Sequence, residues 1–337
     1  MSPIPSHFDP KKVSQVWRVP YEARATGARQ WAAQHHIQPA VQDERKIALI
    51  LIDVQNTFCL PDFELFVGGR SGKGAVDDNV RLCEFIYRNL GEITSIAATL
   101  DTHTAMQIFH AVFLVDNNGN HPGPMTMVSA EDIQVGKWKF NPALAGSLGV
   151  APKQGQHHLA YYTAQLQSRS KFDLTIWPYH AMLGGIGHAL VSAVEEALFF
   201  HSIARYSPSD FILKGENPLT EAYSAIGPEI TEGFQGQTLA TRSKKLLQKV
   251  QSNDAAIIAG QAKSHCVAWT VSDLLDDIRA TDPALAGKVY LLEDCTSPVV
   301  VPGIVDFTEA ADVAFARFVE AGMKIIHSED KLEDLIN

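Results

Sequence analysis

The sequence is poor in the features that mark secreted and membrane-bound proteins. Its 337 residues include only four cysteines, irregularly spaced and without a C-x-x-C pair. Such cysteines do not form a disulfide framework, and a dithiol redox protein would need the missing pair. No apolar run approaches the length that spans a bilayer, and no basic and apolar leader precedes a small-residue cleavage site. We therefore expect a reduced, cytoplasmic protein with no membrane partner.

Positive charge is also scarce. The chain has 28 lysines and arginines against 38 aspartates and glutamates, which gives a formal net charge of −10. An acidic chain of this kind is a poor partner for nucleic acid or anionic lipid. The 46% of hydrophobic and 20% of charged residues are typical of one large globular domain or two ordinary ones.

Glycine-rich nucleotide-binding motifs are missing as well. The stretch "VGGRSGKGA" resembles a phosphate loop, but Val67 stands where the first glycine is required and Gly74 where a hydroxyl residue is required. We interpret this stretch as a flexible loop. The absence of a dinucleotide fingerprint disfavours a dehydrogenase.

The chain does contain a repeated alternation of apolar runs and amphipathic segments. This alternation predicts βαβ units and a parallel sheet between two layers of helices. Strands are predicted in seven runs: 47–55, 93–103, 172–180, 210–215, 255–260, 288–295 and 323–327. Helices are predicted near 22–35, 79–90, 157–167, 188–205, 241–252, 266–280 and 307–322.

Outside this alternation, residues 1–45 read as an N-terminal extension that lies on the domain. Residues 46–337 read as a single α/β domain with insertions at about 104–170 and 216–237.

Chemically active residues stand at or just after the predicted strand ends, where open parallel sheets carry their sites. They are Asp53, Asp101, His180, Lys214 and Cys266.

Cys266 is a candidate nucleophile. It comes six residues after Gly260, the glycine that ends the apolar run, and a helix beginning at His265 or Cys266 would favour the thiolate. Asp53 is a candidate general base, and Lys214 a charge that stabilises both partners. Taken singly, each has a plainer interpretation: a buried inert cysteine, a strand-end cap and a surface lysine.

Asp101 and His103 form D-x-H, a spacing from which one turn can reach a single cation. His180, from what we predict to be a neighbouring strand end, supplies a third ligand. Nitrogen and oxygen ligands of this kind suit divalent zinc, iron or manganese.

Five stretches carry a family resemblance: "ILIDVQNTF", "DTH", "WPYH", "LKGENP" and "GQAKSHCVAWT". They are similar to the isochorismatase-like cysteine hydrolases, and within them to the nicotinamidases. The resemblance implies a three-layer α/β/α fold with a six-stranded, mostly parallel sheet, and a triad of Asp53, Lys214 and Cys266. It also implies supporting and pocket roles for Gln55 and Phe58. Residue Thr57 departs from the family pattern, which has a second acid there.

The resemblance further implies a cis peptide between Gln261 and Ala262, with the amides of Ala262 and Cys266 as the oxyanion hole. It implies metal binding by Asp101, His103 and His180, with Trp177 stacking on the substrate ring. Tyr223 is loosely similar to a tyrosine near the pocket. Two departures are Ala181 in place of a cysteine and Gln107 or Ile108 in place of a further histidine. Four histidines are reserve ligands only, with solvated or core roles favoured: His110, His121, His157 and His158.

The function that this resemblance implies is hydrolysis of a small carboxamide, nicotinamide to nicotinate and ammonia, through a thioester on Cys266. One alternative is another, larger or cyclic amide that the insertions enclose. A second is a non-enzymatic family member with a binding or assembly role. The long insertions also make a homo-oligomer plausible.

Overall fold

Six strands form the central sheet in the computed structural model, which describes residues 2–335. Their spatial order is β12-β9-β8-β1-β2-β7. The strands are β1 (Ile47–Ile52), β2 (Ser95–Asp101), β7 (Asp210–Lys214), β8 (Ala255–Gly260), β9 (Val289–Leu292) and β12 (Lys324–Ile326). Every residue of β1 and β8 is buried, as continuous apolar runs in a parallel sheet should be.

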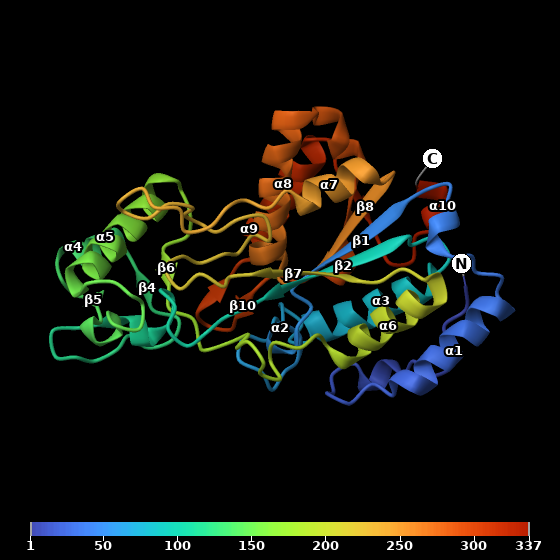
Figure 1. Ribbon diagram of the computed structural model, residues 1–337, viewed down its shortest axis with the longest axis horizontal. Coiled ribbons are helices and arrows are strands. Elements are labelled where there is room, and N and C mark those ends of the chain that lie inside the picture. The colour runs from blue at the N-terminus through green and yellow to red at the C-terminus, as the bar shows by residue number, and fades with distance from the viewer. Residues whose placement is uncertain (1, 336–337) are drawn as a thin grey trace. The chain divides into compact units, whose positions relative to one another are not determined.

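Helices cover both faces of this sheet (Figure 1). On one side lie α3 (Gly74–Arg88) and α6 (Ser192–Arg205), with α1 (Tyr21–Gln34) packed on α6. On the other side lie α7 (Lys245–Ser252) and α8 (Ala268–Thr281), and α9 (Thr308–Glu320) packs against α8. The expected three-layer α/β/α fold with a six-stranded parallel sheet is thereby confirmed.

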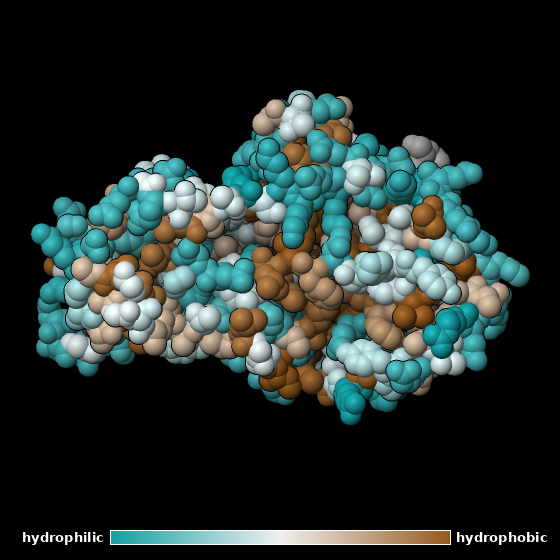
Figure 2. Space-filling view, viewed as in Figure 1, coloured by the Kyte–Doolittle hydropathy of each residue, from teal (hydrophilic) through white to brown (hydrophobic). Residues whose placement is uncertain are grey.

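The amphipathic patterns explain which side of each helix faces the sheet. In α7 the buried residues are Leu246, Leu247 and Val250, whereas Lys244 and Lys245 are exposed. Accordingly, most of the surface over α7 and α8 is hydrophilic in Figure 2.

The N-terminal extension is held by polar contacts to this helical layer. The Ser2 amide donates to the Arg88 carbonyl at 2.7 Å, and the Trp17 amide donates to Ser192 Oγ at 3.0 Å. Arg24 pairs with Glu196 at 2.6 Å. These contacts place the extension across α3 and α6.

By its internal contacts the chain divides into two compact units. The first comprises 1–100, 189–212 and 244–337, and the second 101–188 and 213–243. The second unit contains α4 (Ala130–Gln134), α5 (Pro152–Ser168) and four two-residue strands: β3 (Leu114–Val115), β4 (Met127–Val128), β5 (Lys139–Phe140) and β6 (Leu174–Thr175). The first unit also contains α2 (Asn56–Cys59), α10 (Leu332–Leu335), β10 (Val300–Val301) and β11 (Val305–Asp306).

One predicted strand is wrong. The run 172–180 contributes only β6, which pairs antiparallel with β4 and lies outside the central sheet. Leu174, Ile176 and Trp177 are nevertheless buried, because they belong to the core of the second unit. A short apolar run shows that a segment is buried and does not show against what it packs.

No helix in residues 2–335 is long and apolar enough to cross a membrane.

Gly260, the last residue of β8, should tolerate no side chain. Its φ is +116°, and a Cβ there would lie 2.1 Å from the carbonyl oxygen of Ile52 on β1. We expect Gly260→Ala to lower the free energy of unfolding by more than about 2 kcal/mol, because overpacking and a strained φ act together. Urea unfolding measures this, with Gly91→Ala as the control, since nothing lies within 4 Å of a Cβ at Gly91. Equal losses in the two variants would contradict this account of the β1–β8 junction.

Candidate functional site

The candidate nucleophile lies on the turn that follows β8. Ile52 of β1 pairs with Gly260, and the Gln261 amide donates to the Ile52 carbonyl at 2.8 Å. The chain then passes through a cis peptide between Gln261 and Ala262, at the expected position. Cys266 is buried, with 7% of its surface exposed.

The helix after this turn begins earlier than predicted. Lys263–Val267 forms a π-helical turn that continues into α8, so Cys266 lies inside the helical segment and not at its first residue. The amides of His265 and Val267 both donate to the Ala262 carbonyl, at 3.0 and 3.1 Å. These two amides are therefore engaged in the turn. The oxyanion hole of Ala262 and Cys266 stays a prediction.

Asp53 lies directly after β1 in the same unit as Cys266. Its φ is +48°, a left-handed conformation that Asp adopts more readily than most residues. Its amide donates to Thr99 Oγ1 at 3.0 Å, and the Thr99 hydroxyl donates back to Asp53 Oδ1 at 2.5 Å. The fully buried carboxyl is thus fixed in place by a neighbouring strand. Gln55 and Phe58, the expected supporting residues, are buried just beyond it.

A polar network behind the nucleophile turn escaped the sequence analysis. Gln261 Nε2 donates to Asp78 Oδ2 at 2.8 Å, and the Ser297 amide donates to Gln261 Oε1 at 3.3 Å. Burial raises the pKa of Asp78 to about 6, against the opposing effects of its hydrogen bonds and of Arg81. No spacing motif links residues so far apart in the chain.

Lys263 fixes the same turn from its other side. The Lys263 ammonium contacts Glu293 at 3.1 Å and Asp312 at 2.8 Å. It also lies 4.6 Å from the centre of the Phe315 ring. The turn that carries Cys266 is therefore anchored to α3 through Asp78 and to α9 through Asp312.

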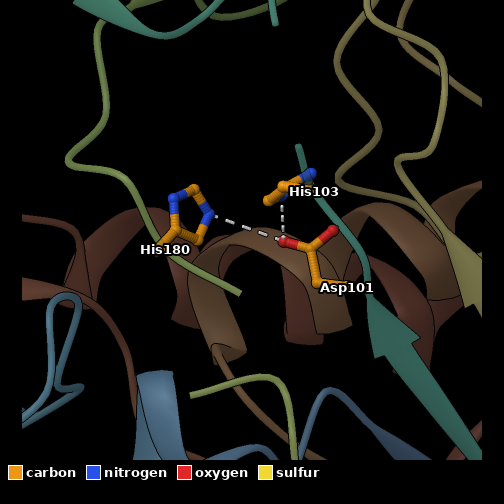
Figure 3. Close-up of side chains that lie close together, drawn as sticks. All are labelled: Asp101, His103 and His180. Atoms are coloured by element: carbon orange, nitrogen blue, oxygen red, sulfur yellow. Dashed lines mark hydrogen bonds and ion pairs between the residues drawn. The ribbon is translucent and has the colours of Figure 1, made fainter. Parts of the chain in front are cut away.

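The predicted metal ligands meet within the second unit (Figure 3). One oxygen or nitrogen each from Asp101, His103 and His180 lie within 4.8 Å of one another, and all three side chains are buried. His103 Nε2 is 2.8 Å and His180 Nε2 is 3.6 Å from Asp101 Oδ2. Burial lowers the pKa of His180 and so favours the neutral imidazole that binds metals. Two imidazoles and one carboxylate are a donor set that fits a divalent transition metal.

The approach of His180 differs from the prediction. It comes from a loop after β6 and not from the end of a sheet strand. The His103 amide donates to the Ala181 carbonyl at 3.0 Å, and the Leu183 amide donates to the His103 carbonyl at 2.9 Å. Backbone pairing of this loop with His103 brings the two imidazoles together.

Lys214, at the end of β7, contacts the same carboxylate. Its Nζ is 2.9 Å from Asp101 Oδ1 and 2.8 Å from the Ala222 carbonyl oxygen. Burial alone would raise the pKa of Asp101, but the charges of His103 and Lys214 hold it well below its ordinary value. The assembly of Lys214 with Asp53 and Cys266 into one triad stays a prediction.

The residues around Asp101 and His103 are closely packed. A Cβ on Gly215 would lie 2.7 Å from a ring carbon of His103 and 2.9 Å from Asp101 Oδ1. Gln107, at the position of the absent histidine, donates to the Gly215 carbonyl at 2.5 Å. The His110 ring centre lies 6.2 Å from that of His103, and burial chiefly lowers the pKa of His110 to about 3.

The other reserve histidines stand apart from the ligand cluster. His121 hydrogen-bonds to the Leu114 carbonyl, His158 hydrogen-bonds to the Leu219 carbonyl, and His157 is exposed on α5.

The two predicted pocket aromatics of this unit are joined by a residue that the sequence analysis did not single out. Trp177 Nε1 donates to Glu221 Oε1 at 2.7 Å and lies 3.1 Å from the Tyr223 hydroxyl. The rings of Trp177 and Tyr223 are perpendicular, at 88°.

Comparison with known proteins supports the fold. No protein-family model and no curated protein sequence matches the chain. Among solved structures, the yeast nicotinamidase superposes with a TM-score of 0.50 at 17% identity, over 83% of this chain and 99% of that chain. A nicotinamidase and pyrazinamidase from Acinetobacter has a TM-score of 0.49 at 16% identity, over 85% of this chain and 98% of that chain. The pyrazinamidase of Pyrococcus horikoshii, in complex with zinc, has a TM-score of 0.43 at 18% identity, over 83% of this chain and 98% of that chain.

These neighbours have the isochorismatase-like fold that the sequence motifs led us to expect. At this identity the yeast structure establishes the fold of the chain and not its activity. Nearly the whole yeast chain is matched by a part of this one, so the chain carries segments beyond the shared fold.

We expect purified protein to bind a divalent metal at Asp101, His103 and His180. Equilibrium dialysis against zinc with metal quantification should give one tight site in the wild type. His103→Ala should weaken it more than about 100-fold, because loss of even an outer partner costs a metal site about 10- to 100-fold. His157→Ala, exposed on α5, and Cys266→Ala, in the other unit, are controls that should retain the metal. Undiminished zinc binding by His103→Ala would show that the cluster is not the site.

Asp78 should make stability depend on pH. Its pKa rises from 3.8 to about 6 on folding, so between these values the folded chain holds a proton that the unfolded chain has released. The contribution of the neutral carboxyl is complete below pH 3.8 and is lost as the pH rises to about 6. Asp78→Asn should therefore lose less stability than the wild type over this window in urea unfolding. Asp62→Asn, exposed, is the control and should parallel the wild type; parallel curves for both variants would contradict the expectation.

Proposed function

We propose that the protein is a metal-dependent cysteine amidohydrolase that converts nicotinamide to nicotinate and ammonia. The observation that carries the proposal is the buried cluster of Asp101, His103 and His180 on the isochorismatase-like fold. Two further features support it: the Asp53 carboxylate, which Thr99 fixes directly after β1, and the buried Cys266 on the turn after the adjacent strand β8.

The reaction would begin with proton transfer from the Cys266 thiol to the Asp53 carboxylate. The thiolate attacks the amide carbonyl, and the amides of Ala262 and Cys266 hold the oxyanion. As this intermediate collapses, the amide nitrogen takes the proton from Asp53 and leaves as ammonia. Water then hydrolyses the thioester, Asp53 again accepts a proton, and the acid product leaves as the thiol re-forms. Lys214 stays charged and favours the ionised forms of its neighbours.

Asp101, His103 and His180 would hold the metal, for which zinc, iron and manganese are the candidates. The bound cation supplies a positive charge that can orient an electron-rich ring atom of the substrate. The residues that we propose to contact the substrate are Gln55, Phe58, Trp177 and Tyr223.

The setting that we propose is a reduced cytoplasm. The four cysteines, Cys59, Cys83, Cys266 and Cys295, are all free thiols. A small-molecule amide is the proposed partner, and the proposed assembly is a homo-oligomer.

A larger or cyclic amide is the second candidate substrate. Both insertions, at about 104–170 and 216–237, fall within the second unit, which also contains the metal cluster. Extra chain next to a substrate-orienting metal is where a changed substrate would be accommodated. A purely binding role would leave the fixed carboxylate and thiol without use.

Ammonia release from nicotinamide tests the proposal. Zinc-, iron- or manganese-loaded wild type should release ammonia, and Cys266→Ala should lower kcat/KM by at least about 1,000-fold, as loss of a nucleophile does. His103→Ala should abolish turnover together with metal binding. Cys83→Ala is the matched control, because Cys83 is a fully buried thiol on α3.

Two results would count against the proposal in different ways. No ammonia from intact, metal-bearing wild type would exclude nicotinamide and redirect the search to larger and cyclic amides. Full activity of Cys266→Ala would exclude the thioester route altogether.

A further inference from the structure

Glu221 is a buried carboxyl that neither the proposed triad nor the metal cluster uses. Only 6% of the residue is exposed, and its Oε1 accepts the indole N–H of Trp177 at 2.7 Å. Its carboxyl also hydrogen-bonds with the Tyr223 hydroxyl, which itself lies 3.1 Å from the same indole nitrogen. The polar edges of both rings thus converge on one side chain.

The backbone of Glu221 is held equally firmly. Its amide donates to the Tyr162 hydroxyl at 3.1 Å, and its carbonyl accepts the Glu229 amide at 2.8 Å. Tyr162 is itself fully buried on α5. The carboxyl therefore has a fixed base from which it can hold the indole.

The next residue connects this contact to the ion pair of the site. The Ala222 carbonyl accepts a hydrogen bond from Lys214 at 2.8 Å, and Lys214 contacts Asp101 at 2.9 Å. The tripeptide Glu221–Tyr223 therefore contacts the Trp177 indole through the side chains of Glu221 and Tyr223, and Lys214 through its central carbonyl. All of these residues belong to the second unit.

A carboxyl in this position is costly unless it has a specific use. Burial, with a contribution from the charge of Glu229, raises the pKa of Glu221 to about 8. An apolar residue would fill the space without that cost. The carboxyl of Glu221 hydrogen-bonds with both the Trp177 indole and the Tyr223 hydroxyl. These two hydrogen bonds fix the angle between the two rings.

We propose that Glu221 is a positioning residue that holds Trp177 and Tyr223 perpendicular and thereby restricts the substrate to flat, aromatic carboxamides. The inference rests on the proposed function for its substrate, since it assigns the two rings to the amide pocket. Its structural part, the fixing of the Trp177 ring by Glu221, stands on the contacts within the second unit alone. A ring face held at one angle stacks well on a flat ring and poorly on a puckered one of the same size.

The test compares benzamide with cyclohexanecarboxamide, which differ in the flatness of the ring. Glu221→Leu should lower the ratio of the two kcat/KM values at least about tenfold, mainly through KM for benzamide, because ring contacts are made in the ground state. Glu221→Gln keeps an acceptor oxygen and should retain the wild-type ratio within about threefold.

The matched controls are Glu229→Leu and Glu229→Gln. Glu229 is also a buried carboxyl in the same segment, and it pairs with Lys171 at 3.0 Å. These variants should leave the ratio unchanged even where they lower stability. A loss of ratio in Glu229→Leu equal to that in Glu221→Leu would show a general structural effect and overturn the inference.

A second readout needs no activity. The indole N–H resonance of Trp177, assigned from its disappearance in Trp177→Phe, should shift in Glu221→Leu and stay in place in Glu229→Leu. An unshifted resonance in folded Glu221→Leu would overturn the inference whatever the enzyme does. If wild type hydrolyses no amide, the proposed function fails. The inference is then decided by this resonance and by calorimetric binding of benzamide, which should weaken about tenfold in Glu221→Leu.

Discussion

The buried ion pair between Asp101 and Lys214 is the interaction on which the second unit depends. Asp101 Oδ1 lies 2.9 Å from Lys214 Nζ, and Asp101 Oδ2 faces His103 and His180. An ionised carboxylate and an ammonium that are both almost completely buried are stable only as partners, because either one alone would leave an uncompensated charge. Since β2 ends at Asp101 and β7 ends at Lys214, the ion pair fixes two neighbouring strand ends. Any cation held by the two imidazoles would therefore be fixed to the central sheet through this carboxylate.

The two compact units hold their candidate site residues by different kinds of contact. In the first, hydrogen bonds fix the Asp53 carboxylate and the turn that carries Cys266, through Thr99 and through the Gln261–Asp78 contact at 2.8 Å. In the second unit, charged and titratable groups make the main contacts. The Lys214–Asp101 ion pair lies beside the two imidazoles, and the buried Glu221 holds the Trp177 ring. The insertions that distinguish this chain fall in the second unit, and the nucleophile turn lies in the first.

The sequence predicted most of the sheet, and two residues of the candidate metal cluster, because both are local patterns. The apolar runs of β1 and β8, the helical periodicity of α3 and α6, and the D-x-H of Asp101 and His103 each fall within a few residues. What it missed depends on contacts between distant segments. The run 172–180 was assigned to the sheet because burial in a second core gives the same apolar pattern. Glu221 and Asp78 carried no signal, because a single acid in a loop or helix does not reveal whether it will be buried beside an indole or an amide.

The structure shows which contacts are made at Thr57 and Ala181, two positions where the sequence departs from the family pattern. Where the resemblance leads one to expect a second acid, Thr57 donates its hydroxyl to the carboxylate of Glu64 at 2.9 Å. A carboxylate from seven residues further along the chain thus stands next to that position. Where a cysteine is expected after His180, Ala181 has a φ of +47° and bonds His103 through its carbonyl oxygen. The contact that brings His180 to His103 is made by the backbone, so the side chain at 181 is not needed to assemble the ligands. At both positions the polar contacts of this chain are thus made by other atoms: by the Glu64 carboxylate beside Thr57, and by the backbone at Ala181.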